Sequence, residues 1–413
     1  MSNLLQSASI LLTPTAYTAS KIECIKPNTS VGDFDFTRAT IATRINSSSF
    51  IQSIVSGLPR IDFTGSTGHW LIESDSTNLD VSSGDLSSGW AASTGASQQV
   101  ETGITPFGIS GNIKRVSGAT NDPPNWVDGV DALKKQYTVT ATDPASTFTF
   151  SVYVKSAGSS TVNIQIRNNT AGPFSRTGAI TLTSDWQRVS VTLAVTTTTT
   201  KIGIVIAGTD GDILLSGAQL EAQEFATSLI PTDGSTVTRN QDLAINSGDT
   251  SLINSTEGVL YGELASFTSS GEPERNISLS DSTLNNTAEI GYSPGTNFAR
   301  FRVRANNVTI LAQNVSVSDT TQFSKMTIKY KSEDIRVFLD GSQVITDTSS
   351  FTFASDLAEL ALDRGNGNNP FTGKIKSIVV FKNALDNDEL EALTGEGFSS
   401  FAALAAAGGF TII

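Results

Sequence analysis

The acidic residues are the side chains of this sequence that could carry out catalysis, because cleavage of a glycosidic bond needs two carboxyl groups that face one another. Among 40 Asp and Glu residues, Glu257 and Glu263 lie six apart, so an unbroken strand would place both on one face. Gly258 and Gly262 lie between them, and no cluster of aromatic residues accompanies them. We interpret the two as solvated strand charges and predict that the protein is not an enzyme.

The chain contains a single histidine, His69, and a single cysteine, Cys24. One histidine cannot form a histidine-based zinc site by itself, and a serine–histidine–acid triad could use no other base. We therefore interpret His69 as a packed or surface side chain. Because one cysteine cannot form a disulfide within the chain, stability must come from packing, together with oligomerisation if the chain assembles.

Aromatic rings are the residues that could bind sugars, because sugar faces stack on the rings of Trp and Tyr. Trp90 and Trp126 lie in the turn-rich stretches SSGWAAS and NDPPNWVDG, and Tyr292 lies in EIGYSPGTN. We name these three as candidate glycan-binding residues. The competing interpretation, that the two tryptophans plug one end of a β-sandwich, stays open. Trp186 alternates into a strand and is expected in the core.

An oxygen-rich loop between residues 363 and 369 could hold calcium, which prefers carboxylate and carbonyl oxygens. Its candidate ligands are Asp363, Asn366 and Asn368. The loop lacks the spacing and the closing Glu of an EF-hand, and Asn-Gly repeats are first of all turn formers. Calcium is the one cofactor that the sequence suggests.

The composition disfavours two classes of partner. Of the 413 residues 16% are charged, with a formal net charge of −13 and a pI near 4.6. Nucleic-acid binding is disfavoured, since it needs a basic surface. No stretch approaches the roughly 18 apolar residues of a membrane span, so no membrane insertion is expected. Met1–Ile10 lacks the basic and apolar pattern of an export signal.

Alternation of apolar and polar residues with a period of two predicts strands through most of the chain. Thr147–Lys155 alternates strictly, and Val162, Ile164 and Ile166 repeat the pattern. Gly, Ser, Asn and Asp turns separate these closely spaced strands. Residues 65–235 are therefore predicted to form an antiparallel β-sandwich.

A second sandwich is predicted over residues 257–385. Its clearest feature is the Asp340-Gly341 pair between two alternating segments, which favours a two-residue hairpin turn because Gly adopts positive φ without strain. The predicted fold class is all-β, with two antiparallel β-sandwiches.

The other regions receive separate predictions. Residues 1–64 hold too few apolar residues for a core of their own, so we expect an attachment or oligomerisation region that packs on a neighbouring subunit or a particle. The polar, turn-rich residues 236–256 are predicted to be a linker. Residues 386–413 should form two short helices, the first capped by Asp386 with Glu389 as its reciprocal partner.

Several ordered motifs resemble a module that recurs in tail, head-fibre and other appendage proteins of phages. They are FDFTRATIATRIN, GLPRIDF, WLIESDSTNLD and GAQLEAQEFATSLIPTDGSTVTRNQDL, and the resemblance covers about residues 10–245. In that family the part between these flanks looks like a jelly-roll carbohydrate-binding module, which the strands TFTFSVYVKS and SDWQRVSVTL match.

The second half resembles a laminin-G or concanavalin-like lectin domain over about residues 257–395. The resemblance rests on IRVFLDGSQV and on GKIKSIVVFKNALDNDELEAL. It is specific for the fold and weak for function, because this fold hosts lectins, enzymes and plain spacers.

Together the two resemblances imply a bacteriophage virion appendage, a tail or head fibre-like protein that adheres to host surface glycans. They also imply other virion proteins as partners, a homotrimer, host surface polysaccharide as ligand, and a protein made in the host cytoplasm and released by lysis. The alternatives are a structural or decoration protein of the virion that binds no glycan, and a polysaccharide-degrading enzyme or a bacterial lectin.

Overall fold

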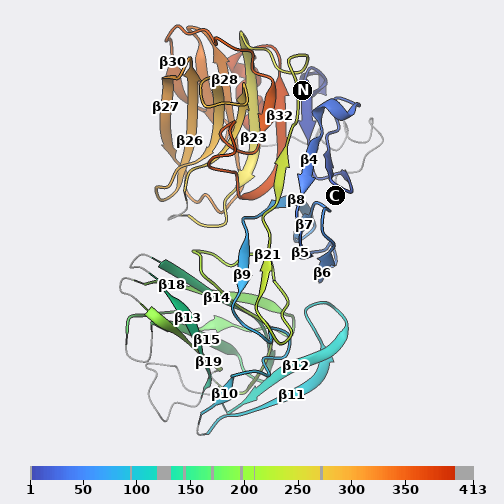
Figure 1. Ribbon diagram of the computed structural model, residues 1–413, viewed down its shortest axis with the longest axis vertical. Coiled ribbons are helices and arrows are strands. Elements are labelled where there is room, and N and C mark those ends of the chain that lie inside the picture. Colours follow the sequence, from blue (N-terminus) through green and yellow to red (C-terminus); the bar gives the residue numbers. More distant parts are fainter. Residues whose placement is uncertain are drawn as a thin grey trace. The chain divides into compact units, whose positions relative to one another are not determined.

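The computed structural model describes residues 2–93, 95–118, 132–142, 146–168, 172–195, 199–208, 210–269 and 273–395. Strands account for 53% and helices for only 4% of the structure, so the predicted all-β fold class is confirmed (Figure 1). The chain forms two compact units. Unit 1 comprises residues 1–39, 54–74 and 241–413, and unit 2 comprises residues 40–53 and 75–240.

Unit 1 is built from antiparallel sheets. Its large sheet has eight strands: β30 (Ser342–Asp347), β29 (Ile335–Leu339), β28 (Ser324–Lys331), β23 (Glu257–Ala265), β32 (Gly373–Phe381), β8 (Thr67–Ile72), β7 (Ile61–Thr64), and β1 (Ile10–Leu12), which pairs with β32. A second sheet has five: β27 (Val308–Ser316), β26 (Phe298–Ala305), β25 (Thr287–Tyr292), β24 (Arg275–Ser280) and β31 (Glu359–Ala361). A third has four: β2 (Ala16–Thr18), β3 (Lys21–Glu23), β4 (Phe34–Thr37) and β22 (Leu243–Ile245).

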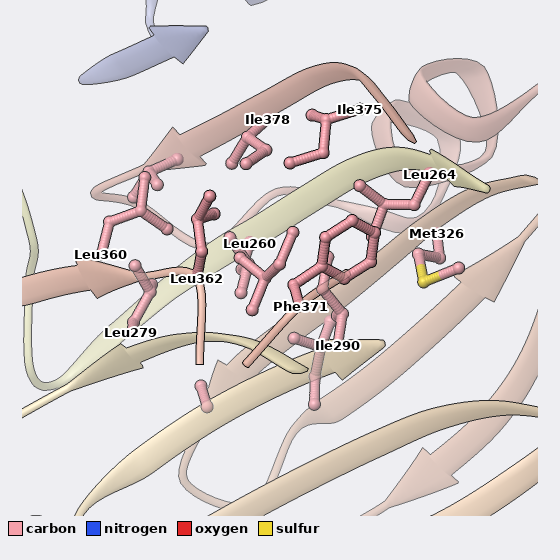
Figure 2. Close-up of a cluster of buried hydrophobic side chains, with 14 of the residues drawn as sticks. Leu260, Leu264, Leu279, Ile290, Met326, Leu360, Leu362, Phe371, Ile375 and Ile378 are labelled. Atoms are coloured by element: carbon pink, nitrogen blue, oxygen red, sulfur yellow. The ribbon is translucent and has the colours of Figure 1, made fainter. Parts of the chain in front are cut away.

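The core of unit 1 lies between the eight-stranded and five-stranded sheets. Alternate residues of each strand point inward, which is why the sequence alternates. Figure 2 shows the side chains that meet there, among them Leu260, Leu264, Leu279, Ile290, Phe371, Ile375 and Ile378. The predicted hairpin is confirmed, since β29 and β30 meet at Asp340 and Gly341, both with positive φ.

Most of the region predicted to attach to a neighbouring subunit or a particle belongs to unit 1, whereas residues 40–53 belong to unit 2. β1 and β8 share one edge of β32, and β7 extends the same sheet. Ile10 and Trp70 are buried in the unit 1 core. Residues 1–39 and 54–64 therefore complete a core that the C-terminal half supplies, and a role of this region in attachment or oligomerisation stays a prediction.

The predicted linker, residues 236–256, contains the boundary between the two units, which lies between residues 240 and 241, and it also contains paired strands. β21 (Val237–Arg239) pairs with β9 (Ser76–Asn78), and β22 pairs with β4. Residues on both sides of residue 240 are therefore held in sheets rather than left as a free connection.

Unit 1 contains a buried cluster of four charges, one from each of the four motifs quoted for residues 10–245. Arg38 contacts Asp242 at 2.9 Å, and Arg60 contacts both Asp242 and Glu73. The Asp242 carboxylate also accepts the backbone N–H of Glu73 at 3.0 Å. Burial opposes the charge of Arg60, but Asp242 and Glu73 together raise the pKa of Arg60 above its ordinary value. The cluster joins three segments that are distant in sequence.

Unit 2 is a sandwich of two antiparallel sheets. One contains β10 (Ala91–Ala92), β13 (Leu133–Thr142), β19 (Thr199–Gly208), β15 (Thr161–Asn168), β16 (Phe174–Arg176) and β17 (Ile180–Thr181). The other contains β11 (Ser97–Ile104), β12 (Ser110–Ser117), β20 (Asp212–Glu221), β14 (Ser146–Ala157) and β18 (Gln187–Val195). A hairpin of β5 (Ala42–Ile45) and β6 (Ile51–Ile54) lies outside both sheets. Trp186 lies outside the main core, half-buried against Tyr153, so its predicted core position is wrong.

The helices are short. α1 spans Ser2–Gln6 and α2 spans Asn387–Thr394. The predicted capping box is confirmed, because the backbone N–H of Glu389 donates to Asp386 at 2.8 Å and Asp386 N–H donates to Glu389 at 2.9 Å. The second predicted helix falls in residues 396–413, outside the described part. Among the described residues, no helix is long and apolar enough to cross a membrane.

Candidate functional site

The side of the five-stranded sheet that points away from the unit 1 core is polar, and we call it the polar face of unit 1. Two rows of paired residues cross it: Asn276–Gly291–Arg300–Asn314 and Ser278–Glu289–Arg302–Ala312. Paired residues of antiparallel strands point to the same side of a sheet, so each row forms a line of neighbouring side chains.

Arg302 holds two carboxylates on this face. It contacts Glu289 at 2.9 Å and Glu274, which precedes β24, at 2.5 Å. Arg300 approaches Glu274 at 3.3 Å, and Arg364 approaches Glu289 at 3.5 Å. Thr287 donates its hydroxyl to the other Glu289 oxygen at 2.6 Å. The carboxylates are thus fixed by ion pairs and hydrogen bonds.

Burial changes the acidity of this network. The Glu289 side chain is fully buried, and this burial raises its pKa above the ordinary value, against the opposing charge of Arg302. Burial, followed by repulsion from Arg302, lowers the pKa of Arg300. Both shifts reflect charges that are poorly solvated and depend on one another.

Two buried polar side chains beside the network have unused hydrogen-bonding atoms. For the Asn276 amide oxygen and nitrogen, and for the Ser278 hydroxyl, the described residues provide no hydrogen-bond partner. Both residues are fully buried. Buried polar groups are normally satisfied, so these atoms mark a place where a polar ligand could bind.

The predicted calcium loop lies at the rim of this face. The backbone N–H of Asn276 donates to the Asn369 carbonyl at 3.2 Å, and the Asn369 amide donates to Glu274 at 3.1 Å. Asp363 accepts the backbone N–H of Gly365, and Asn366 accepts that of Asn368 at 3.2 Å.

These are Asx turns, in which a side-chain oxygen holds the backbone two residues ahead. Among the described residues, no group of three or more His, Cys, Asp or Glu side chains could hold a metal. The geometry of the loop is explained by turn formation, and calcium at Asp363, Asn366 and Asn368 stays a prediction.

The predicted sugar-stacking rings are placed inside the cores. Trp90 is buried in unit 2 and donates its ring N–H to Asp80 at 3.1 Å. Tyr292 is buried in unit 1 and donates its hydroxyl to the Leu264 carbonyl at 2.8 Å. Because both rings are buried, neither can stack on a sugar, and both predictions are wrong. For Trp90 the competing interpretation, a ring packed inside the sandwich, agrees with the structure. Trp126 lies outside the described residues.

The two glutamates considered as an acid pair, Glu257 and Glu263, each form an ion pair with a different lysine. Glu257 pairs with Lys331 at 2.8 Å, and Glu263 pairs with Lys376 at 3.4 Å. Both glutamates lie on β23, and their contacts agree with strand charges rather than with a catalytic pair. His69 is fully buried with its ring against Phe323, at a centroid distance of 5.8 Å.

Sequence reasoning did not find Glu274, Glu289 or Asn276. The signal for Asn276 and Glu289 was the alternation on β24 and β25, where polar residues take every second position, whereas Glu274 precedes β24 and had no such signal. Arg302 is also part of this network, and it is only 6% exposed although it is charged. Its partners come from β25 and from the segment before β24, which strand pairing brings beside it.

Residues 266–391 match the concanavalin A-like lectin/glucanases superfamily. The matched residues are less than half of the chain. The polar face of unit 1 lies within the matched segment. No curated protein matches the chain. Unit 1 therefore contains a concanavalin-like domain, a fold shared by binding proteins and enzymes.

Three solved structures illustrate a weaker likeness. The Ruminococcus gnavus IT-sialidase CBM40 is 16% identical over 36% of this chain and 92% of that chain, with a TM-score of 0.30. The CBM22-1 xylan-binding domain of Paenibacillus barcinonensis Xyn10C is 16% identical over 37% and 94%, with a TM-score of 0.27. The enzymatically active domain of bacteriophage CBA120 tailspike protein 4 is 17% identical over 37% and 21%, with a TM-score of 0.25. At such values the likeness does not bear on function.

Proposed function

We propose that this chain is a non-catalytic glycan-binding protein, and that its concanavalin-like domain binds sugar hydroxyls on the polar face of unit 1. The observation that carries the proposal is the unsatisfied amide of Asn276 beside the unsatisfied hydroxyl of Ser278. An amide can donate to one sugar hydroxyl and accept from the next, and a serine hydroxyl can do either. The superfamily match over residues 266–391 supports the same conclusion.

Access to these atoms would pass the arginines at the edge of the network. The side chains of Arg300 and Arg364 are each 17% exposed, whereas Asn276 and Ser278 are fully buried. A ligand would displace part of the arginine cover and gain charge-assisted hydrogen bonds from it. Sites of this kind are individually weak, and several copies acting together would supply useful avidity.

Binding of the full chain to a panel of bacterial surface polysaccharides tests the proposal. We expect at least one polysaccharide to bind, and Asn276→Ala to weaken that binding about tenfold through the loss of amide hydrogen bonds. Asn285→Ala is the matched control, since Asn285 is exposed on the same unit. No binding to any polysaccharide, or equal binding by the two variants, would contradict the proposal.

A glycoside hydrolase is the second candidate, because Glu274 and Glu289 lie on one face of a fold that also hosts glucanases. The contacts weigh against it. Both Glu289 oxygens are occupied, one by Thr287 and one by Arg302, whereas a general acid needs an oxygen directed at its substrate. Release of reducing ends from a bound polysaccharide, abolished by Glu289→Gln, would establish the enzyme instead.

We further propose that the chain is a trimeric component of a bacteriophage virion, a tail or head fibre-like protein that adheres to host surface glycans. The motifs between residues 10 and 245 that resemble phage appendage modules support this. Mass photometry of the purified chain should give three times the 43.4 kDa chain mass. Labelling on intact particles should locate it in the virion. A monomer without particle labelling would contradict this placement, and a labelled particle without glycan binding would favour the decoration role.

A further inference from the structure

Unit 2 carries a second polar face, on the side of the β13–β19–β15–β16 sheet that points away from its core. β13, β19 and β15 are adjacent strands of unit 2 (Figure 1). Two rows cross this face: Gln136–Gly203–Arg167–Phe174 and Lys134–Val205–Gln165–Arg176. We call it the Arg167 face.

Arg167 is a buried cation for which the described residues provide no counter-charge. The residue is only 4% exposed, and within the described ranges its Nε and Nη1 atoms have no hydrogen-bond partner. Burial lowers the pKa of Arg167, and no neighbouring charge offsets that effect. The buried arginines Arg38, Arg60 and Arg302 differ, since each contacts a carboxylate. Arg167 therefore lacks the partner that buried charges in proteins normally have.

Two amide side chains on the same face as Arg167 also have atoms without a hydrogen-bond partner among the described residues. In the part of the chain that the structure describes, no partner exists for the Gln165 amide oxygen and nitrogen, or for the Gln136 amide nitrogen. Gln165 is fully buried beside Arg167 on β15. Gln136 lies across Gly203, in the same row as Arg167.

Gly203 leaves a gap in this row because it has no side chain. Gln136 and Arg167 flank it from the two neighbouring strands, two interstrand spacings apart, or about 9 to 10 Å between their backbones. On the other side of Arg167, the edge strand β16 places Phe174 in the same row with 44% of its surface exposed. An exposed ring next to hydrogen-bonding groups is the arrangement that stacks on a sugar face.

We propose that the Arg167 face binds a sugar that carries a carboxylate, such as a uronic or sialic-type acid. The Arg167 guanidinium pairs with the carboxylate, Gln165 and Gln136 hydrogen-bond to neighbouring hydroxyls, and Phe174 stacks on the ring. One unpaired cation matches one negative charge, which favours a carboxylate over a doubly charged phosphate monoester. The proposal deepens the proposed glycan binding and rests on it, but it places an acidic sugar in unit 2 rather than in unit 1.

Calorimetric titration of the full chain tests this with four probes: 3′-sialyllactose and lactose, and tri-galacturonate and its carboxyl-reduced counterpart. We expect at least one acidic probe to bind and its neutral counterpart to bind about tenfold or more weakly. Arg167→Gln should abolish this difference, and Phe174→Ala should weaken the acidic probe severalfold. Arg44→Gln is the control, since it removes one positive charge elsewhere in unit 2. Equal affinity for acidic and neutral sugars, tighter binding of glucose 6-phosphate, or unchanged binding by Arg167→Gln would each overturn the proposal.

Thermal unfolding separates a binding role from a structural one. Removing an unpaired buried cation should leave the Tm of ligand-free protein unchanged or raise it, so a lower Tm in Arg167→Gln would show that Arg167 serves folding and would overturn the proposal. The polar face of unit 1 is tested in the same titrations. If Asn276→Ala abolishes acidic-sugar binding and Arg167→Gln does not, the proposed function stands and this inference fails.

Discussion

The buried charge cluster of unit 1 makes a sharp prediction through Asp242→Asn. The Asp242 carboxylate is fully buried and contacts Arg38 at 2.9 Å, Arg60, and the backbone N–H of Glu73 at 3.0 Å. The amide keeps the shape and one acceptor but loses the charge that two buried guanidinium groups share. Breaking a buried pair in this way costs about 3–5 kcal/mol, because it leaves uncompensated charge in the interior.

Urea unfolding followed by circular dichroism measures this loss, with each transition fitted separately because two units need not unfold together. The control is Asp35→Asn, which removes the Lys21–Asp35 pair at 3.0 Å, where the side chains are 38% and 48% exposed. An exposed pair contributes about 0–1 kcal/mol, so the control should stay close to the wild type. If both variants lose the same small amount, the cluster does not hold the N-terminal segments to unit 1 and our reasoning about the motifs is refuted.

Three further predictions concern single residues. Burial lowers the pKa of His69 below its ordinary 6.5, so as the pH falls the unfolded chain binds a proton before the folded chain does. The free energy of unfolding should therefore decrease below about pH 6.5, by up to about 1.4 kcal/mol per pH unit. His69→Phe should remove this slope in urea titrations at pH 5 to 7, and an unchanged slope would contradict the prediction. Asp386→Ala should destabilise unit 1 by about 1 kcal/mol, because the variant loses the N-cap of α2. Asp388→Ala, at an exposed position of the same helix, is the control, and equal stability of the two variants would contradict the prediction. Millimolar calcium should raise the Tm if the loop of Asp363, Asn366 and Asn368 binds the ion as predicted, and Asp363→Asn should abolish that rise. An unchanged Tm would show that the loop is a set of turns only.

Strands and local turns could be predicted because their causes are local. The strict alternation of Thr147–Lys155 corresponds to β14, which spans Ser146–Ala157. The Asp340-Gly341 turn follows from the conformational freedom of glycine, and the α2 capping box from two side chains three residues apart. In each case the residues that determine the structure are neighbours in the sequence.

The division of the chain into units could not be predicted because its cause is long-range. Ile10 pairs with Val380, and Trp70 pairs with Ile375. Nothing near Ile10 in the sequence indicates that its partner lies beyond residue 370. A segment with few apolar residues looks like an attachment region when it is considered alone, although it completes a core contributed by the other end of the chain.

The two candidate binding faces show why site residues were harder to predict than strands. Arg302 and Arg167 occupy similar places in the pattern, each a polar residue that directly follows an apolar one on a strand, and an interpretation as solvated charge suits both. Strand register makes their surroundings different, because it places Glu289 beside Arg302 but Gly203 and Phe174 beside Arg167. The first arginine is satisfied within the described fold and the second is not. Function in such a sandwich therefore depends on which buried polar groups the register leaves without a partner, a property that appears only once the strands are paired.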